Sequence, residues 1–123
     1  MGIQVGLRAS AGLTVGDLDT AIALKSGDVP VLGTPRVVAL MEQAAVAAVA
    51  GALGEGATSV GTHIAVDHLA PSLVGSSVLA SAEVIGVEGR SVSFRLAAHE
   101  GEKLVAKGTH TRVVVDRKRF LGS

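Results

Sequence analysis

Two residues on one predicted helix, Thr34 and Glu42, have the types and the spacing for acid–base chemistry with a third group. In a helix that begins near residue 34, their Cα atoms lie roughly 12 Å apart along the axis and about 80° apart around it. Helical side chains lean toward the N-terminus, so Glu42 reaches back toward Thr34. The remaining gap of about 7–8 Å matches one imidazole with a hydrogen bond at each nitrogen. A strand histidine therefore fits between them, and the spacing leaves open which histidine and which subunit supplies it.

Glu42 itself stands in an apolar run, LGTPRVVALMEQAAVAAVAGAL, over residues 32–53. A buried carboxylate is costly without a partner, which would make Glu42 a functional acid. The alternative is a carboxylate that faces an exposed gap or the rim of a dimer. Its neighbours favour burial, because a solvated helix face normally carries several charges and none follows Glu42 before Glu55.

Four histidines are available for the gap. His99 stands at a predicted turn and is most simply solvated, while His110 lies within a strand and has a structural role by default. His63 and His68 differ by five positions in one predicted strand, so alternation places them on opposite faces. His68 stands at the strand end, where its side chain can project into a cleft while the strand fixes its position.

The composition restricts the class of protein. A chain of 123 residues predicts one domain over 1–123. The 11 basic residues equal the 11 acidic ones, which argues against nucleic acid as a partner. The absence of cysteine excludes thiolate metal sites, and we expect no metal and no cofactor. MGIQVGLRAS lacks the pattern of a signal peptide, so a cytoplasmic location is the default expectation.

The helix that positions Thr34 and Glu42 is predicted over about 34–53. Thr34 is a good N-cap, Pro35 is a good first helical residue, and Gly51 and Gly54 mark the end. The run has almost no polar face, so we expect the helix to be buried on all sides. A membrane span would place the Glu42 carboxylate near the bilayer centre, and we expect no membrane partner.

The rest of the chain is predicted to be mainly strand and turn. The strands after the helix are joined by short connections, which predicts an antiparallel meander. A twisted sheet of this kind wraps one apolar helix, so we expect an α+β chain with the hotdog fold, paired edge to edge in a dimer. The predicted elements are strand 3–8, a short strand with a turn in 13–24, loop 25–33, and strands 58–69, 76–89, 90–101 and 102–116.

These motifs resemble the fluoroacetyl-CoA thioesterase-like branch of the hotdog superfamily. The resemblance covers roughly residues 34–119, with the motifs in the family's order and spacing. It rests on T-x7-E at Thr34 and Glu42 with LME at 40–42, VGTHIAVDHLAPSLVG at 60–75, VEGRSVSFRLAAHEG at 87–101 and GTHTR at 108–112.

The resemblance implies an acyl-CoA thioesterase in which Thr34, Glu42 and His68 are catalytic and Gly61 lies close to the acyl thioester. Two routes stay open. In one, Thr34 attacks the thioester after His68 takes its proton, with Glu42 orienting the imidazole. In the other, Glu42 or His68 activates water or attacks directly, and Thr34 only donates to the carbonyl. Backbone N–H groups near Gly61 or at the helix start are candidates for the oxyanion site.

One segment departs from the family pattern. Selectivity for the fluorinated acyl group is associated with phenylalanines ahead of the helix, and here that segment, KSGDVPVLG, has none. We therefore expect a small or medium acyl group against Val29, Val31 and Leu32, with Gly33 and Thr62 also lining the substrate site.

The expected partners are an acyl-CoA and a second copy of the chain, as a dimer or a tetramer. The CoA phosphates would meet basic residues that by default are ordinary surface charges. The alternative function is a non-catalytic hotdog module that binds acyl-CoA or a related thioester. The candidate phosphate contacts are Arg90, Lys107, Arg112 and Lys118.

Overall fold

The computed structural model describes residues 2–122. One long helix and five strands make up most of the chain, with a short 3₁₀ turn at Asp17–Asp19. The elements are β1 (Arg8–Thr14), α1 (Thr34–Ala50), β2 (Ala57–His68), β3 (Ser77–Glu88), β4 (Ser91–Glu100), β5 (Lys103–Asp116) and α2 (Arg117–Phe120).

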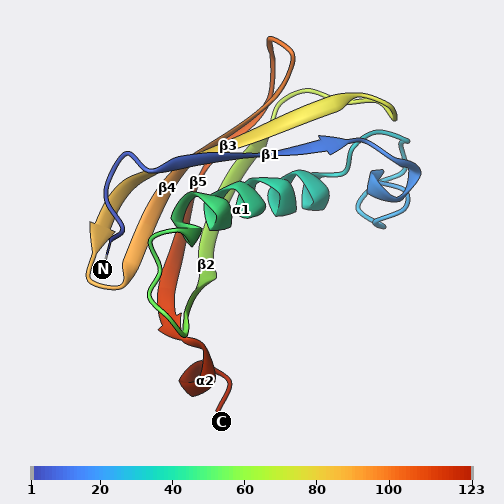
Figure 1. Ribbon diagram of the computed structural model, residues 1–123. Coiled ribbons are helices and arrows are strands. Elements are labelled where there is room, and N and C mark those ends of the chain that lie inside the picture. Colours follow the sequence, from blue (N-terminus) through green and yellow to red (C-terminus); the bar gives the residue numbers. More distant parts are fainter. Residues whose placement is uncertain (1, 123) are drawn as a thin grey trace.

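The five strands form one antiparallel sheet in the order β1-β3-β4-β5-β2. Figure 1 shows this sheet curling around α1, with β1 and β3 running along the helix and β5 and β2 crossing it steeply. The helix packs mainly against β1 and β3. The predicted α+β hotdog arrangement of a sheet wrapped on one central helix is confirmed.

The core forms between one side of α1 and the inner face of the sheet. Alternation along β3 and β4 sends every second side chain inward, as the sequence pattern predicts. Phe94 is the largest fully buried side chain. The helix contributes Val37, Leu40, Met41, Ala44, Ala45, Ala48 and Val49.

The helix differs from its prediction at both ends and on one side. Gly33 occupies the N-cap, Thr34 is the first helical residue, and the helix ends at Ala50 rather than near residue 53. Burial on all sides is wrong for the single chain, because the sheet covers one side only and Val46 on the other is 43% exposed. An apolar helix face is therefore available for contact with another surface.

The first strand was expected over residues 3–8 and lies at Arg8–Thr14. Gly6 adopts a positive φ of 100° and turns the chain, which ends the alternating run early. The short strand expected within 13–24 is also wrong, since β1 ends at Thr14 and the 3₁₀ turn follows.

The meander prediction is confirmed for β3, β4 and β5 and is wrong for β2. β2 pairs with β5 at the far edge of the sheet and is not a neighbour of β3. The connection from Leu69 to Ser76 crosses the end of the sheet, and Leu73 forms a bridge with Val31 on the way. β2 is therefore an edge strand, and among residues 2–122 it pairs only with β5.

Candidate active site

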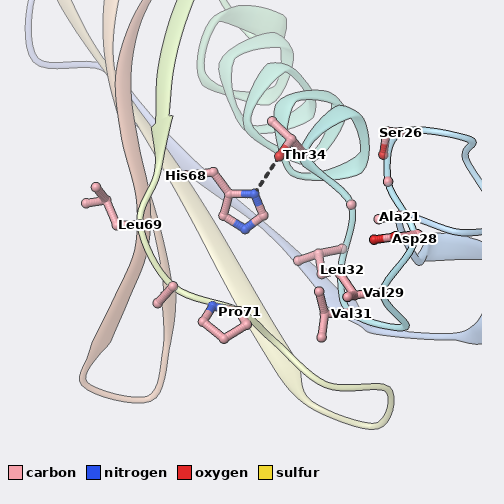
Figure 2. A pocket seen from close by; sticks show the side chains of 13 residues that line it. Ala21, Ser26, Asp28, Val29, Val31, Leu32, Thr34, His68, Leu69 and Pro71 are labelled. Atoms are coloured by element: carbon pink, nitrogen blue, oxygen red, sulfur yellow. Dashed lines mark hydrogen bonds between the residues drawn. The ribbon is translucent and has the colours of Figure 1, made fainter.

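Thr34 and His68 meet through one hydrogen bond of 2.8 Å between Oγ1 and Nδ1. Thr34 is the first residue of α1 and His68 is the last residue of β2, so two rigid elements fix the pair (Figure 2). The Thr34 hydroxyl is used here instead of capping the helix, which explains why the N-cap prediction for this residue is wrong.

Close backbone packing positions Thr34. The N–H of Gly33 donates to the carbonyl of Asp19 at 2.9 Å, and the N–H of Leu32 donates to that of Ser72 at 2.9 Å. A Cβ on Gly33 would lie 3.1 Å from the Cα of Ala21, so this position has no room for a side chain. These contacts hold the start of α1 against the segment before it.

His68 is set up to accept a proton. Burial lowers the pKa of His68 from its ordinary value of 6.5, and a contact with the backbone of Ala70 partly offsets this. A neutral imidazole whose Nδ1 accepts from Thr34 carries its proton on Nε2. That Nε2 atom is buried, and no group among residues 2–122 is within hydrogen-bond geometry of it.

The Thr34–His68 pair opens into a pocket of about 370 Å³. Figure 2 shows Leu32 and Pro71 on the side of the imidazole away from Thr34. Leu32 and Gly33 line this pocket as expected for the substrate site, whereas Gly61 and Thr62 lie outside it. The other lining residues are Ala21, Ser26, Gly27, Asp28, Val29, Val31, Leu69, Ala70 and Pro71.

Glu42 lies apart from this pair. Its Oε2 accepts a hydrogen bond from Nη1 of Arg112 at 3.3 Å and lies 3.7 Å from Nε2 of His110. No hydrogen bond or ion pair between Glu42 and His68 is found among the described residues, so one imidazole does not bridge Thr34 and Glu42 within this chain. Gly61, beside Glu42, and His68 are seven positions apart, and seven strand steps span about 23 Å, far more than the helix advances over eight residues.

Gly61 gives Glu42 room at the strand. A Cβ at this position would lie 2.8 Å from Oε2 of Glu42 and 3.1 Å from Cε1 of His110. The pairing of β2 with β5 shifts register between Gly61 and His63, which leaves Thr62 as the extra residue. The Thr62 hydroxyl donates to the carbonyl of Thr111 at 3.3 Å on the exposed side of the strand.

Two residues that sequence reasoning left out of the site surround Glu42. Arg112 was treated as a surface charge and is only 7% exposed, and His110 is 2% exposed. Burial lowers the pKa of His110, although its bond to the backbone of His63 acts in the opposite direction. The signal was present in the alternation of β5, which puts His110 and Arg112 on the same inward face as Val114.

The fold and this arrangement define a class, the hotdog-fold proteins. The chain is 29% identical to a hot-dog-like protein from Thermanaerovibrio acidaminovorans, with a TM-score of 0.87 over 97% of this chain and 88% of that one. A family model described as FlK, fluoroacetyl-CoA-specific thioesterase, matches residues 15–118. The chain therefore belongs to the FlK family of hotdog-fold thioesterases.

Two relatives carry the same family name. The fluoroacetyl-CoA thioesterase of Streptantibioticus cattleyicolor is 42% identical over 90 residues, which are 73% of this chain and 65% of that protein, slightly less than two thirds of its length. A point variant of FlK solved with fluoroacetate and CoA is 36% identical, with a TM-score of 0.88 over 96% of this chain and 99% of that one.

Proposed function

We propose that this chain hydrolyses an acyl-CoA thioester, with Thr34, Glu42 and His68 as its catalytic group. The observation that carries the proposal is the hydrogen bond from Thr34 to a half-buried His68 at the mouth of a pocket. The family match and the relative solved with CoA support the substrate class. A hydroxyl paired with a neutral imidazole is the arrangement that acyl transfer requires of a nucleophile and its base.

In the proposed reaction His68 takes the Thr34 proton at Nδ1 as Oγ1 attacks the thioester carbonyl. The tetrahedral intermediate collapses with loss of the CoA thiolate, which takes the proton from His68. Water then attacks the acyl-threonine with His68 again as base, and the carboxylic acid is released. The second route, in which Glu42 or His68 activates water directly and Thr34 only donates to the carbonyl, uses the same residues and stays open.

We propose a small or medium acyl group as the substrate. The pocket beside His68 has Val29, Val31 and Leu32 in its wall and no aromatic side chain. Its volume of about 370 Å³ suits a short aliphatic chain. The segment that carries selectivity for fluoroacetyl in the namesake enzyme lacks phenylalanine here, so we do not extend that selectivity to this chain.

We further propose a homodimer, or a tetramer built from it, formed through the unpaired edge of β2 and the exposed side of α1. Such a dimer protects an edge strand and covers apolar surface. It also offers a way for His68 of one copy and Glu42 of another to share a site. The candidate contacts for the CoA phosphates are Arg90, Lys107 and Lys118. Arg112 is no longer a candidate, because it is buried and donates to Glu42.

The described residues include no helix long and apolar enough to cross a membrane. A cytoplasmic location and a single domain over residues 1–123 remain part of the proposal.

A panel of acyl-CoAs with a thiol reagent tests the function, because hydrolysis releases a free CoA thiol. We expect release with short acyl groups by the wild-type protein and its loss in Glu42→Gln and His68→Ala. The alternative is a non-catalytic module that binds acyl-CoA or a related thioester, favoured because no hydrogen bond or ion pair joins Glu42 to His68 among residues 2–122. Tight binding without release across the panel, unchanged in Glu42→Gln, would establish that alternative.

A further inference from the structure

Arg112, His110 and Ser59 surround Glu42 in a partly buried cluster on β5 and β2, and these three residues have no role in the proposed reaction. Arg112 makes four of the five hydrogen bonds that a guanidinium can donate. Its Nε donates to Oγ of Ser59 at 2.8 Å, and its Nη2 donates to the Ser59 carbonyl at 3.1 Å. Its Nη1 donates to Oε2 of Glu42 at 3.3 Å and to Nε2 of His110 at 3.1 Å.

These partners fix the protonation of His110. Its Nδ1 lies 2.7 Å from the carbonyl oxygen of His63, which only accepts, so Nδ1 must carry a proton. Its Nε2 faces an arginine N–H, which only donates, so Nε2 must be unprotonated. His110 is therefore the neutral Nδ1–H tautomer, and its 3.7 Å contact with Glu42 is not an ion pair.

Glu42 is consequently held by one cation and on one oxygen only. Of the two groups that contact its Oε2, Arg112 is charged and His110 is neutral. No hydrogen bond or ion pair within residues 2–122 involves Oε1 of Glu42. The Glu42 side chain is 37% exposed, so Oε1 remains accessible from the solvent side while Oε2 is anchored.

We infer that Arg112 is a positioning residue that anchors Glu42 as a carboxylate through Oε2 and leaves Oε1 free as the reactive oxygen. The expected effect on kcat rests on the proposed function. The contact between Arg112 and Glu42 rests on the geometry alone. This contact assigns Glu42 an accepting role, toward water or an imidazole N–H, rather than that of a proton donor. Gly61 is also needed for this contact, because a Cβ added at this position would displace Oε2 of Glu42.

The kinetic test removes the Arg112 side chain in two backgrounds, one with Glu42 present and one with Glu42→Gln. We expect Arg112→Met to lower kcat by about 10–100-fold with little change in KM, the scale of loss for a misplaced catalytic group. In a Glu42→Gln background the same change should have no further effect on kcat. Compared with Arg112→Met, Arg112→Lys should recover part of the lost kcat, because lysine retains the positive charge but lacks the planar guanidinium. The matched control is Arg95→Met, which removes an exposed arginine from β4.

If Arg112→Met does not fold, Ser59→Ala is the second variant, because it removes one acceptor of the guanidinium and keeps its charge. It should lower kcat by a smaller factor, again only when Glu42 is present. Losses that multiply independently in the double variants would overturn the inference, because Arg112 would then act without Glu42.

A second measurement does not depend on activity. ¹⁵N chemical shifts of the imidazoles at pH 7 should show His110 as the neutral Nδ1–H tautomer in the wild-type protein. In Arg112→Met the Nδ1–H bond to His63 remains, whereas Nε2 no longer faces a donor, and we expect it to take up a proton beside Glu42. A protonated His110, or a proton on Nε2, in the wild type would overturn the anchor. If no acyl-CoA is hydrolysed, the proposed function fails, and the ¹⁵N result alone decides whether Arg112 holds Glu42 in the manner inferred.

Discussion

The hydroxyl of Thr34 and Nδ1 of His68 lie 2.8 Å apart, at the first residue of the helix and the last residue of the edge strand. Each side chain sits where a regular element ends, so its position is fixed while its polar atom faces the pocket. The proton acceptor for Thr34 is therefore already within hydrogen-bond distance of its hydroxyl, and catalysis would need no rearrangement of this pair.

Removal of the Thr34 hydroxyl should lower hydrolysis strongly. We expect Thr34→Val to reduce kcat/KM by about 10²–10⁴-fold, because the shape is kept and the group that His68 activates is lost. Thr34→Ser should retain most activity, since it keeps the hydroxyl. Acyl-CoA hydrolysis by both variants checks this, and mass spectrometry of quenched reactions tells whether an acyl-enzyme forms. Wild-type rates in Thr34→Val would remove Thr34 from the catalytic group.

The activity should persist into mildly acidic solution. Burial lowers the pKa of His68 below its ordinary value of 6.5, so the imidazole stays neutral and able to accept a proton at pH values where an exposed histidine is charged. The acidic limb of kcat/KM should therefore have its midpoint below pH 6.5, with activity lost as the pH falls through the lowered pKa. A midpoint above 6.5 would show that His68 is not the base.

A methyl group at Gly61 should lower both activity and stability. A Cβ at this position would lie 2.8 Å from Oε2 of Glu42, the end of a flexible side chain that can move aside, and 3.1 Å from Cε1 of the buried His110, which must also shift slightly. We expect Gly61→Ala to lower kcat by about 10-fold or more, because Glu42 moves off Arg112, and to lower Tm as well, because the buried Arg112 loses its ion pair. Gly86→Ala is the matched control, because it also adds a methyl group at a strand irregularity, where its nearest contact, at 3.8 Å, is ordinary. Equal losses of activity in both variants would contradict the role of Gly61.

The long strands were predictable because their own residues specify them. β4 alternates strictly and β3 alternates as far as Val84, and Gly89, between them, turns with a positive φ of 60°. The position of β1 was predicted wrongly because its sequence pattern is weak: its inward residues are small, and Ala11 alone is buried. Its position depends on pairing with β3 instead. The neighbour of β2 was missed because it depends on a crossing connection that no local signal marks.

The candidate site was predictable only in part. The helix spacing of Thr34 and Glu42 predicted that one imidazole would contact both residues. The family resemblance indicated that His68 supplies this imidazole. That expectation treated the strand as free to place His68 anywhere, whereas its long rise per residue separates the two ends. Arg112 was missed because arginine is usually exposed, and its burial depends on several partners that become neighbours only in the folded sheet.

The stability of the chain should fall in acid partly through His110. Burial lowers its folded pKa, so the unfolded chain takes up a proton near pH 6.5 before the folded chain does. The contribution of His110 is complete above pH 6.5 and is lost as the pH falls through the lowered value, by up to about 1.4 kcal/mol per pH unit. His110→Gln keeps a donor for His63 and an acceptor for Arg112 without titrating, so urea unfolding between pH 7 and 5 should show a shallower loss. His99→Gln, on the exposed side of β4, serves as the control, and an unchanged slope in His110→Gln would contradict the assignment.

The separation of His68 from Glu42 within one chain leads to a test with mixed chains. If the site is shared across the proposed dimer, a His68→Ala chain and a Glu42→Gln chain each lack one member when alone. In the mixed dimer one of the two shared sites recovers both native residues, so co-refolding the two inactive proteins should restore up to about a quarter of wild-type activity for random pairing. If each chain forms its own site, both sites of the mixed dimer stay defective. Restoration would therefore place His68 and Glu42 on opposite subunits, whereas its absence, in a sample shown to contain mixed dimers, would require Glu42 to act on the thioester without touching His68.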